Sequence, residues 1–275
     1  VNLTRKISSL LIIFRTNSNI EIWDQNKKRI FEKKKIEYVK RSLNSLIKTI
    51  KNLRENYHSI NIEIKIVDDN STEENLKIIK DILAKSKENF EIINHKNEEH
   101  LNIIKKQKSK DTFSNLSSLL KCFEIGKKYG DDLIYFIEDD YLHFKFALEE
   151  MIGTYERIGS QLNKELIICP SDYPYLYMNN EKTNLLIGSK RHWRTINKSL
   201  CSFMTSKKIL NQYWNNYYQN CLDRYDPFEK YLNLIYEKEI CISPIKSLSI
   251  HMTNINSSYG LPPFINYKSL WEDNE

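Results

Sequence analysis

Glycine is scarce in this chain, and its scarcity excludes two common ways of binding a phosphate. Only six of the 275 residues are glycine, and six are proline. Neither the G-x-G-x-x-G fingerprint of dinucleotide-binding domains nor the GxxxxGK(S/T) sequence of P-loops occurs. No Pro/Gly-rich linker and no internal repeat divides the chain. We therefore predict a single domain over residues 1–275.

Cysteines are too few and too scattered to hold the fold together. The five cysteines include no CxxC pair and their number is odd, which argues against a disulfide framework and against a zinc ribbon. They are Cys122, Cys169, Cys201, Cys221 and Cys241. Several lie beside apolar residues, so we expect buried thiols in a reducing compartment, and hence a cytoplasmic protein.

Long apolar runs are missing as well. No run approaches the roughly 18 residues that a membrane-spanning helix needs, so no transmembrane segment is predicted. The apolar run nearest the N-terminus, Leu10–Phe14, is interpreted as a strand rather than as the apolar region of a signal peptide.

The charge balance is mildly basic. Lysine and arginine number 42 against 36 aspartate and glutamate residues, which gives a formal net charge of +6. This excess favours anionic partners such as nucleotides, phosphorylated sugars or acidic glycans, and it fits a weak peripheral contact with an anionic membrane. It is too dispersed for nucleic-acid binding. The densest runs, Lys33–Lys35 and Lys105–Lys110, are interpreted as solvated faces.

The first half of the chain alternates strands and helices. Continuous apolar runs or strict alternation predict strands, and apolar residues at helical spacing predict helices. Strands are expected at Leu10–Phe14, Ile60–Val67, Phe90–Ile93 and Leu133–Ile137, and helices at Tyr38–Leu53, after a capping box at Ser71 and Glu74, and at Leu116–Tyr129. Such alternation predicts an α/β protein with a parallel sheet. Residues 95–112 are polar and are expected to form an inserted loop.

The second half has weaker patterns. Strands are expected at Leu166–Cys169, Leu185–Gly188, Leu200–Thr205 and Ile240–His251. Helices are expected at Lys207–Tyr218 and Pro227–Tyr236, the latter with Asp226 as its N-cap and Pro227 in its first turn.

Two of the expected parallel strands end in a pair of carboxylates. Asp68 and Asp69 follow one strand, and Asp139 and Asp140 follow another. Ligands of open α/β sheets bind outside the carboxyl ends of the strands. Adjacent carboxylates there favour a divalent cation, and Mg²⁺ or Mn²⁺ takes one or two of them together with phosphate oxygens and water. The alternative is that these residues only shape turns and cap helices.

The order and spacing of these two pairs resemble a known family. Val67-Asp-Asp-Asn-Ser-Thr72 resembles the nucleotide-binding turn of family-two glycosyltransferases, and Phe136-Ile-Glu-Asp-Asp140 resembles their DxD-type metal motif. The resemblance covers roughly residues 8 to 206. It implies the GT-A fold, which is Rossmann-like with a mostly parallel central sheet between helices, and a metal-dependent, inverting enzyme. Residues 1–140 would bind the nucleotide sugar, and residues 141–275 the acceptor.

The resemblance also implies roles for single residues. Asp68 or Asp69 would hydrogen-bond the base and ribose, Asp139 would contact the ribose or the metal, and Asp140 would bind the metal. The backbone after the first strand would meet the base, at Arg15, Thr16 and Asn17. Arg15 replaces the family's usual residue there, so the base stays open between uracil and guanine, in a UDP- or GDP-sugar.

An inverting transferase needs a general base for the acceptor hydroxyl. By chain order, Asp223 and Asp226 occupy the position of the family's base, and Asp226 is preferred. Its alternative role is that of a helix N-cap. Asp172 is the competing candidate for the base or for an acceptor contact.

Four further residues are candidates for the metal or the substrate. A late histidine in many such enzymes is a metal ligand, and His251 is at that place. His192 or Arg194 could hold diphosphate oxygens, and Trp193 could stack on a sugar ring. The alternative is that His251 is an ordinary histidine and that Trp193 packs beside a salt-bridged Arg194.

The sequence thus predicts a glycosyltransferase that moves a sugar from a nucleotide donor to a glycan or other hydroxyl acceptor, as in polysaccharide biosynthesis, with Mn²⁺ or Mg²⁺. A nucleotidyltransferase is one alternative, although Phe14-Arg-Thr-Asn-Ser18 lacks the glycine-rich loop usual in that class. A non-catalytic domain that binds a nucleotide or glycan is the other.

Overall fold

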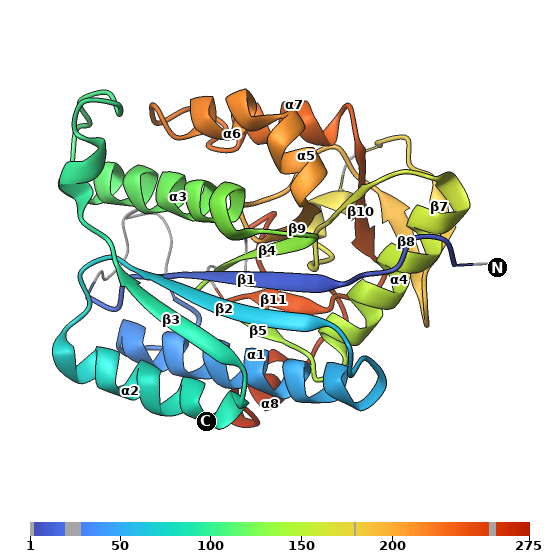
Figure 1. Cartoon of the computed structure of the whole chain (residues 1–275), viewed down its shortest axis with the longest axis horizontal. Coiled ribbons are helices and arrows are strands. Elements are labelled where there is room, and N and C mark those ends of the chain that lie inside the picture. The colour runs from blue at the N-terminus through green and yellow to red at the C-terminus, as the bar shows by residue number, and fades with distance from the viewer. Residues whose placement is uncertain (1–2, 20–28, 179, 253–256) are drawn as a thin grey trace.

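A nine-stranded sheet runs through the molecule, with helices on both of its faces (Figure 1). The structure is a computed structural model that describes residues 3–19, 29–178, 180–252 and 257–275. The strands of this sheet, in their spatial order, are β3 (Asn89–Asn94), β2 (Asn61–Asp68), β1 (Ser9–Thr16), β4 (Leu133–Glu138), β9 (Phe203–Ser206), β6 (Leu166–Ile168), β10 (Ile240–Pro244), β8 (His192–Thr195) and β7 (Leu185–Ile187).

The sheet is mostly parallel. Within it, only β9 and β8 run against the other described strands. It is also continuous across the two halves of the chain, because β9 pairs with β4. The predicted fold class, α/β with a mostly parallel central sheet between helices, is confirmed.

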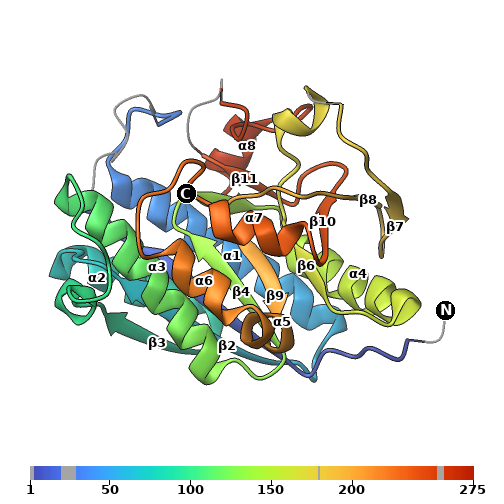
Figure 2. The same ribbon diagram turned by 90° about the horizontal axis from the view of Figure 1, so that it is seen from above.

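The helices cover the sheet in two groups (Figures 1 and 2). Their bounds are α1 (Lys35–Asn56), α2 (Glu73–Leu83), α3 (Lys110–Tyr129), α4 (Ala147–Leu162), α5 (Lys207–Gln212), α6 (Trp214–Asn220), α7 (Lys230–Tyr236) and α8 (Tyr267–Glu272). One face carries α1, α2 and α4, and the other carries α3, α5, α6 and α7. Burial on both faces explains why β1 and β4 are continuous apolar runs.

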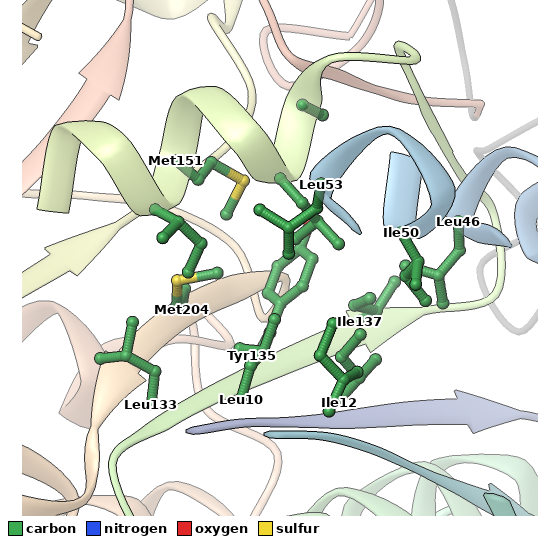
Figure 3. Packing of buried hydrophobic residues seen from close by; sticks show 14 of the residues in the cluster. Leu10, Ile12, Leu46, Ile50, Leu53, Leu133, Tyr135, Ile137, Met151 and Met204 are labelled. Atoms are coloured by element: carbon green, nitrogen blue, oxygen red, sulfur yellow. The ribbon is translucent and has the colours of Figure 1, made fainter. Parts of the chain in front are cut away.

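The core on the α1 face is built from residues of the sheet and of two helices (Figure 3). Leu46, Ile50 and Leu53 of α1 and Met151 of α4 pack against the sheet. The sheet contributes Leu10, Ile12, Leu133, Tyr135, Ile137 and Met204. A second cluster on the opposite face contains all five cysteines, each buried and without a disulfide, as predicted.

A small antiparallel sheet lies beside the end of β4. It joins β5 (Tyr141–His143) to β11 (Ser249–His251), with His251 opposite Tyr141 in the register. A third apolar cluster, which includes Trp271 of α8, packs beneath it. This pairing brings the C-terminal part of the chain to the turn at Asp139 and Asp140.

Several predicted bounds in the second half are wrong. The predicted helix over 207–218 is two helices that meet at Tyr213. The predicted strand over 240–251 is β10 and β11, separated by a turn in which Lys246 has a φ of 67°. Helix α7 begins at Lys230 after an N-cap at Glu229, so Asp226 is not its N-cap, and the Asp226–Pro227 peptide is cis.

In the first half, the polar segment 95–112 is not an open loop. It contains the 3-10 helix η2 (Asn97–His100), and His95 and His100 are both buried, each with a ring nitrogen 2.8 Å from the Ser117 hydroxyl. Helix α3 begins earlier than predicted, because Ser109 caps it at Thr112. The cap of α2 is Thr72 rather than Ser71. Across the described residues, no helix is both long enough and apolar enough to cross a membrane.

Candidate active site

The carboxylate pairs predicted from the sequence lie at one end of the sheet. β2, β1 and β4 are neighbours and run in the same direction, and their registers align Asp68 with Thr16 and Arg15 with Glu138. The carboxyl ends of these strands therefore gather Asp68, Asp69, Glu138, Asp139 and Asp140. We call these five residues the acidic end of the sheet.

Asp68 is fully buried and keeps one oxygen without a partner. Its Oδ2 accepts a hydrogen bond from the Ser71 N–H at 3.1 Å, whereas its Oδ1 has no hydrogen-bond partner among the described residues. Burial raises the pKa of Asp68, and the charges of Asp69 and Asp139 add to this rise against the hydrogen bonds from Ser71. An unpaired buried acceptor is costly, and Oδ1 keeps its capacity to accept a hydrogen bond.

Asp69 instead ties secondary-structure elements together. Its carboxylate accepts hydrogen bonds from the hydroxyl of Ser114 on α3 and, at 3.1 Å, from the side-chain amide of Asn97 on η2. Its backbone N–H donates to the carbonyl of Thr16 at 2.8 Å. Asp69 is thus held from three sides, and it fixes the turn that follows β2.

The side chain of Arg15 is engaged inside the protein. Its guanidinium lies 2.5 Å from Oε1 of Glu138 and donates to the carbonyl of Asn115 on α3 at 3.0 Å. Burial lowers the pKa of Arg15, but the acidic groups around it, Glu138 foremost, together raise it by more, so the guanidinium stays charged. The pair lies one residue before the turn at Asp139 and Asp140.

Both carboxylate oxygens of Asp139 have partners, which lie at the end of the first strand and at the start of the first helix. Its Oδ2 accepts from the Thr16 hydroxyl at 2.9 Å and from the Asn17 N–H at 3.1 Å. Its Oδ1 lies 2.5 Å from Nζ of Lys35, at the start of α1. The structure therefore brings three predicted site residues, Thr16, Asn17 and Asp139, into direct contact.

Asp140 faces His251. Oδ2 of Asp140 lies 3.5 Å from Nε2 of His251 and 4.0 Å from Nζ of Lys35. Burial raises the pKa of Asp140, but the positive charges of His251, Lys35 and Arg15 together lower it by more, and the carboxylate is ionised at neutral pH. The pairing of β5 with β11 is the reason that a residue so distant in the chain reaches Asp140.

The ring of His251 is oriented by its surroundings. It stacks on Tyr141, and its Nδ1 lies 3.4 Å from the carbonyl oxygen of Tyr259. A carbonyl only accepts hydrogen bonds, so Nδ1 carries the proton in this arrangement. Loss of the Nε2 proton, which metal binding requires, would leave a lone pair on Nε2 directed toward Asp140 and toward a cation between the two.

This donor set fits a divalent ion. Metal–ligand distances for Mg²⁺ and for histidine nitrogen are about 2.1 Å, so two neighbouring ligands of one ion are about 3 Å apart, close to the separation of Asp140 and His251. In the described part of the chain, no group of three or more His, Cys, Asp or Glu residues could hold an ion. Two protein ligands suit Mg²⁺ or Mn²⁺, which take their other ligands from phosphate and water.

Tyrosines surround this pair of residues. The hydroxyl of Tyr141 lies 2.6 Å from that of Tyr173, and Tyr173 and Tyr175 both pack against Tyr259. Tyr173 and Tyr175 are buried, whereas Tyr177 is about half exposed. Tyr173 and Tyr175, which follow β6, therefore pack beside the ring of Tyr141 or Tyr259 within the protein. Among the five tyrosines named in this paragraph, only Tyr177 is exposed enough to contact an acceptor.

Asp172 is buried in an ion pair away from the acidic end. Its Oδ1 pairs with the guanidinium of Arg194, and its Oδ2 accepts from the Tyr177 hydroxyl at 2.6 Å and from the Lys246 N–H at 3.3 Å. A carboxylate with both oxygens engaged in this way is a structural anchor between β8 and the loops after β6 and β10.

His192, Trp193 and Arg194 lie in strand β8. In the sheet, β9, β6 and β10 lie between β8 and β4, which at about 4.8 Å per strand places β8 roughly 19 Å from β4. Trp193 is fully buried and donates to Oε1 of Glu150 at 3.0 Å, so its ring has no exposed face for a sugar. His192 is exposed. The structure does not bring these three residues to the acidic end.

The loop that carries Asp223 and Asp226 lies between α6 and α7 on the α3 face. Farther along it, Oε1 of Glu229 lies 3.9 Å from the thiol of Cys201, and the next residue, Ser202, accepts a hydrogen bond from the Glu138 N–H at 3.0 Å. Asp223 accepts hydrogen bonds from Gln107 and pairs with Lys105, and both lower its pKa. Asp226 is exposed.

The sequence interpretation missed Lys35 and assigned no role to Tyr141. Lys35 belongs to the run Lys33–Lys35, which was interpreted as solvated. Lys33 and Lys34 are indeed exposed, but the side chain of Lys35 is only 12% exposed. The available signal was helical spacing, because Lys35 lies one turn before Tyr38 and Val39 on the buried face of α1.

No protein-family model matches the sequence, and no curated protein matches it. Several solved structures are similar in fold. TarS 1–349 of S. aureus is 13% identical, over 88% of this chain and 59% of that one, with a TM-score of 0.49. The galactosyltransferase LgtC, in complex with donor and acceptor sugar analogues, is 10% identical over 84% of this chain and 72% of that one, with a TM-score of 0.46.

UDP-glucose pyrophosphorylase complexed with UDP-glucose is also similar, at 10% identity over 98% of this chain and 97% of that one, with a TM-score of 0.41. The present chain thus spans about 59% of the length of TarS 1–349. These similarities concern the path of the backbone, and they assign no residue a role.

Proposed function

We propose that this protein is a glycosyltransferase of the GT-A type, which moves a sugar from a nucleotide-sugar donor to a hydroxyl group of a glycan acceptor with inversion at the anomeric carbon. The observation that carries the proposal is the meeting of Asp140 and His251 at the acidic end, 3.5 Å apart. This pair follows β4, which pairs with β1, and β1 pairs in turn with β2, the strand that ends at Asp68 and its unpaired buried oxygen.

The donor nucleoside binds at the ends of β1 and β2 in this proposal. Oδ1 of Asp68 accepts a hydrogen bond from the base or from a ribose hydroxyl, which satisfies its missing partner. Asp69 and Asp139 hold the two turns around the nucleoside through their contacts with Ser114 and Thr16. The base is uracil or guanine, in a UDP- or GDP-sugar.

The metal site is formed by Asp140 and His251. Mn²⁺ or Mg²⁺ bound there would neutralise negative charge on the departing diphosphate. Asp140 contributes an ionised carboxylate, and Tyr141 and the carbonyl of Tyr259 orient His251 so that Nε2 faces the ion.

Asp226 is the proposed general base. It takes the proton of the acceptor hydroxyl as that oxygen attacks the anomeric carbon, opposite to the departing diphosphate. Its exposed position leaves it accessible to an acceptor, whereas Asp223 is paired with Lys105 and Gln107 and Asp172 with Arg194.

A thermal-shift screen tests the proposal. UDP, GDP and their sugars are each added with and without Mn²⁺ to the wild-type protein and to Asp140→Asn. A ligand at 100 times its dissociation constant adds about 2.7 kcal/mol to the free energy of unfolding, which raises the Tm of a domain of this size by about 5 °C. We expect one nucleotide to give this rise with Mn²⁺ and a smaller rise without it, and Asp140→Asn to lose the part that depends on Mn²⁺.

Turnover then separates the transferase from its alternatives. The nucleotide sugar identified in the screen should release its nucleoside diphosphate in the presence of Mn²⁺, slowly with water and faster with a suitable glycan. Release of pyrophosphate from a nucleoside triphosphate and a sugar phosphate would instead show a nucleotidyltransferase. Binding without turnover of any donor would indicate a binding domain, and a folded protein with no nucleotide response would contradict the proposal.

A further inference from the structure

Lys35 brings a positive charge into the acidic end. Its ammonium lies 2.5 Å from Oδ1 of Asp139 and 4.0 Å from Oδ2 of Asp140, and its side chain is 12% exposed. A buried lysine is costly unless it is paired, so its position between two carboxylates is a specific arrangement.

Asp139 holds this ammonium in place. Its Oδ2 is fixed by Thr16 and by the N–H of Asn17, which leaves Oδ1 directed at Lys35. An ammonium has three N–H donors, and the close contact with Asp139 engages one of them. The 4.0 Å separation from Asp140 is too long for a hydrogen bond, so that side of the ammonium can turn to another oxygen anion.

A diphosphate bound at the acidic end would need a further positive charge. A diphosphate adds several negative charges next to Asp139 and Asp140, more than one divalent ion neutralises. Arg15 cannot supply the difference, because Glu138 engages its guanidinium. Helix α1 starts at Lys35 without a side-chain cap, so the positive end of its dipole adds to the same potential.

Resting on the proposed function, we propose that Lys35 is a binding residue for the donor diphosphate, a fixed cation that Asp139 holds beside the metal ligand Asp140. Lys35 then supplies the share of diphosphate affinity that persists without a divalent ion. Asp139 is the positioning residue for this ammonium.

The experiment compares a nucleoside diphosphate with its monophosphate in EDTA. Dissociation constants for UDP and UMP, or for GDP and GMP if the screen selects guanine, are measured by calorimetry for the wild type, Lys35→Met and Lys34→Met. Lys34 is the matched control, because it is the exposed neighbour and its loss removes the same charge. The quantity compared is the ratio of monophosphate to diphosphate dissociation constants.

We expect the wild type and Lys34→Met to bind the diphosphate about tenfold more tightly than the monophosphate in EDTA, as a charge-assisted hydrogen bond predicts. In Lys35→Met the two constants should become nearly equal, with the monophosphate constant unchanged. The double variant Lys35→Met/Asp139→Asn removes both charges of the pair, so it keeps the test valid if Lys35→Met alone does not fold. The double variant should lose the preference for the diphosphate in the same way as Lys35→Met.

A ratio in Lys35→Met or in the double variant equal to that of the wild type would overturn the role of Lys35 while leaving the transferase proposal intact. Equal dissociation constants of the wild type for the monophosphate and the diphosphate in EDTA would also overturn the role of Lys35. If the wild type binds no nucleotide either in EDTA or in Mn²⁺, both proposals fail together.

Discussion

The imidazole of His251 stacks on the ring of Tyr141, with the ring centroids 4.7 Å apart and the planes inclined by 13°. The two residues face each other because β5 and β11 pair in that register. The stack fixes the plane of the imidazole, and with it the direction in which Nε2 meets Asp140. As the proposed metal ligand, His251 would bind an ion with little further loss of rotational freedom.

This orientation predicts the metal affinity of two variants. His251→Ala removes a ligand, and we expect Mn²⁺ to bind at least tenfold more weakly, since loss even of supporting residues around metal ligands costs 10–100-fold. Tyr141→Phe keeps the stacked ring and should change Mn²⁺ affinity much less. Electron paramagnetic resonance of Mn²⁺ measures both constants without any substrate. Equal Mn²⁺ affinity in His251→Ala and the wild type would remove His251 from the site.

The two aspartates of the turn should respond differently to the same substitution. Asp139→Asn leaves the buried ammonium of Lys35 without its partner, and breaking a buried pair costs about 3–5 kcal/mol of unfolding free energy. Asp140→Asn removes a carboxylate whose described partners lie at 3.5 and 4.0 Å, and it should cost much less. Urea denaturation in EDTA measures both. Similar losses in the two variants would contradict the distinction between them.

The choice of base gives a further contrast. Asp226 is exposed, so Asp226→Asn should leave the unfolding free energy unchanged and lower kcat by about 10²–10⁴-fold. Asp172→Asn breaks the buried pair with Arg194, so it should lower the unfolding free energy by about 3–5 kcal/mol. The activity per folded molecule of Asp172→Asn should stay near that of the wild type. Normal kcat in Asp226→Asn would exclude this residue as the base.

The buried His143 predicts how stability depends on pH. Burial lowers the pKa of His143 from 6.5 to about 3, and its Nε2 lies 2.7 Å from the Tyr135 hydroxyl. Between these two pH values the unfolded chain binds a proton on His143 that the folded protein does not. The free energy of unfolding therefore falls by about 1.4 kcal/mol for each pH unit below 6.5.

His143→Gln should reduce this slope, and substitution of the exposed His58 by glutamine should leave it unchanged. Urea denaturation at intervals between pH 6.5 and pH 4 measures the slope for the three proteins. An unaltered slope in His143→Gln would show that His143 does not control acid stability.

The strands at the centre of the sheet and the carboxylates at their ends were predictable from the sequence. β1 and β4 are covered by helices on both faces, so their sequences are continuous apolar runs that give a strong strand signal. Parallel strands end on the same side of a sheet, and that rule alone places Asp68 and Asp139 at the same edge. These inferences need only local pattern and topology.

Lys35 and Trp193 could not be placed in this way. The burial of Lys35 depends on where the start of α1 lies relative to the turn after β4, and its neighbours Lys33 and Lys34 carry the same charge but are exposed. Trp193 lies in a strand of four residues, too short to show a period, and its indole is buried through a contact with Glu150 on α4. Both outcomes are set by tertiary packing.

The β5–β11 pairing has a consequence for how the protein is made. Asp140 and His251 lie in opposite halves of the chain, and they meet only through this two-stranded sheet. During synthesis on the ribosome, β1, β2 and β4 emerge long before His251 does. The nascent chain can therefore pair the strands around β1 while it still lacks one of the two proposed metal ligands, and the proposed metal site is completed last.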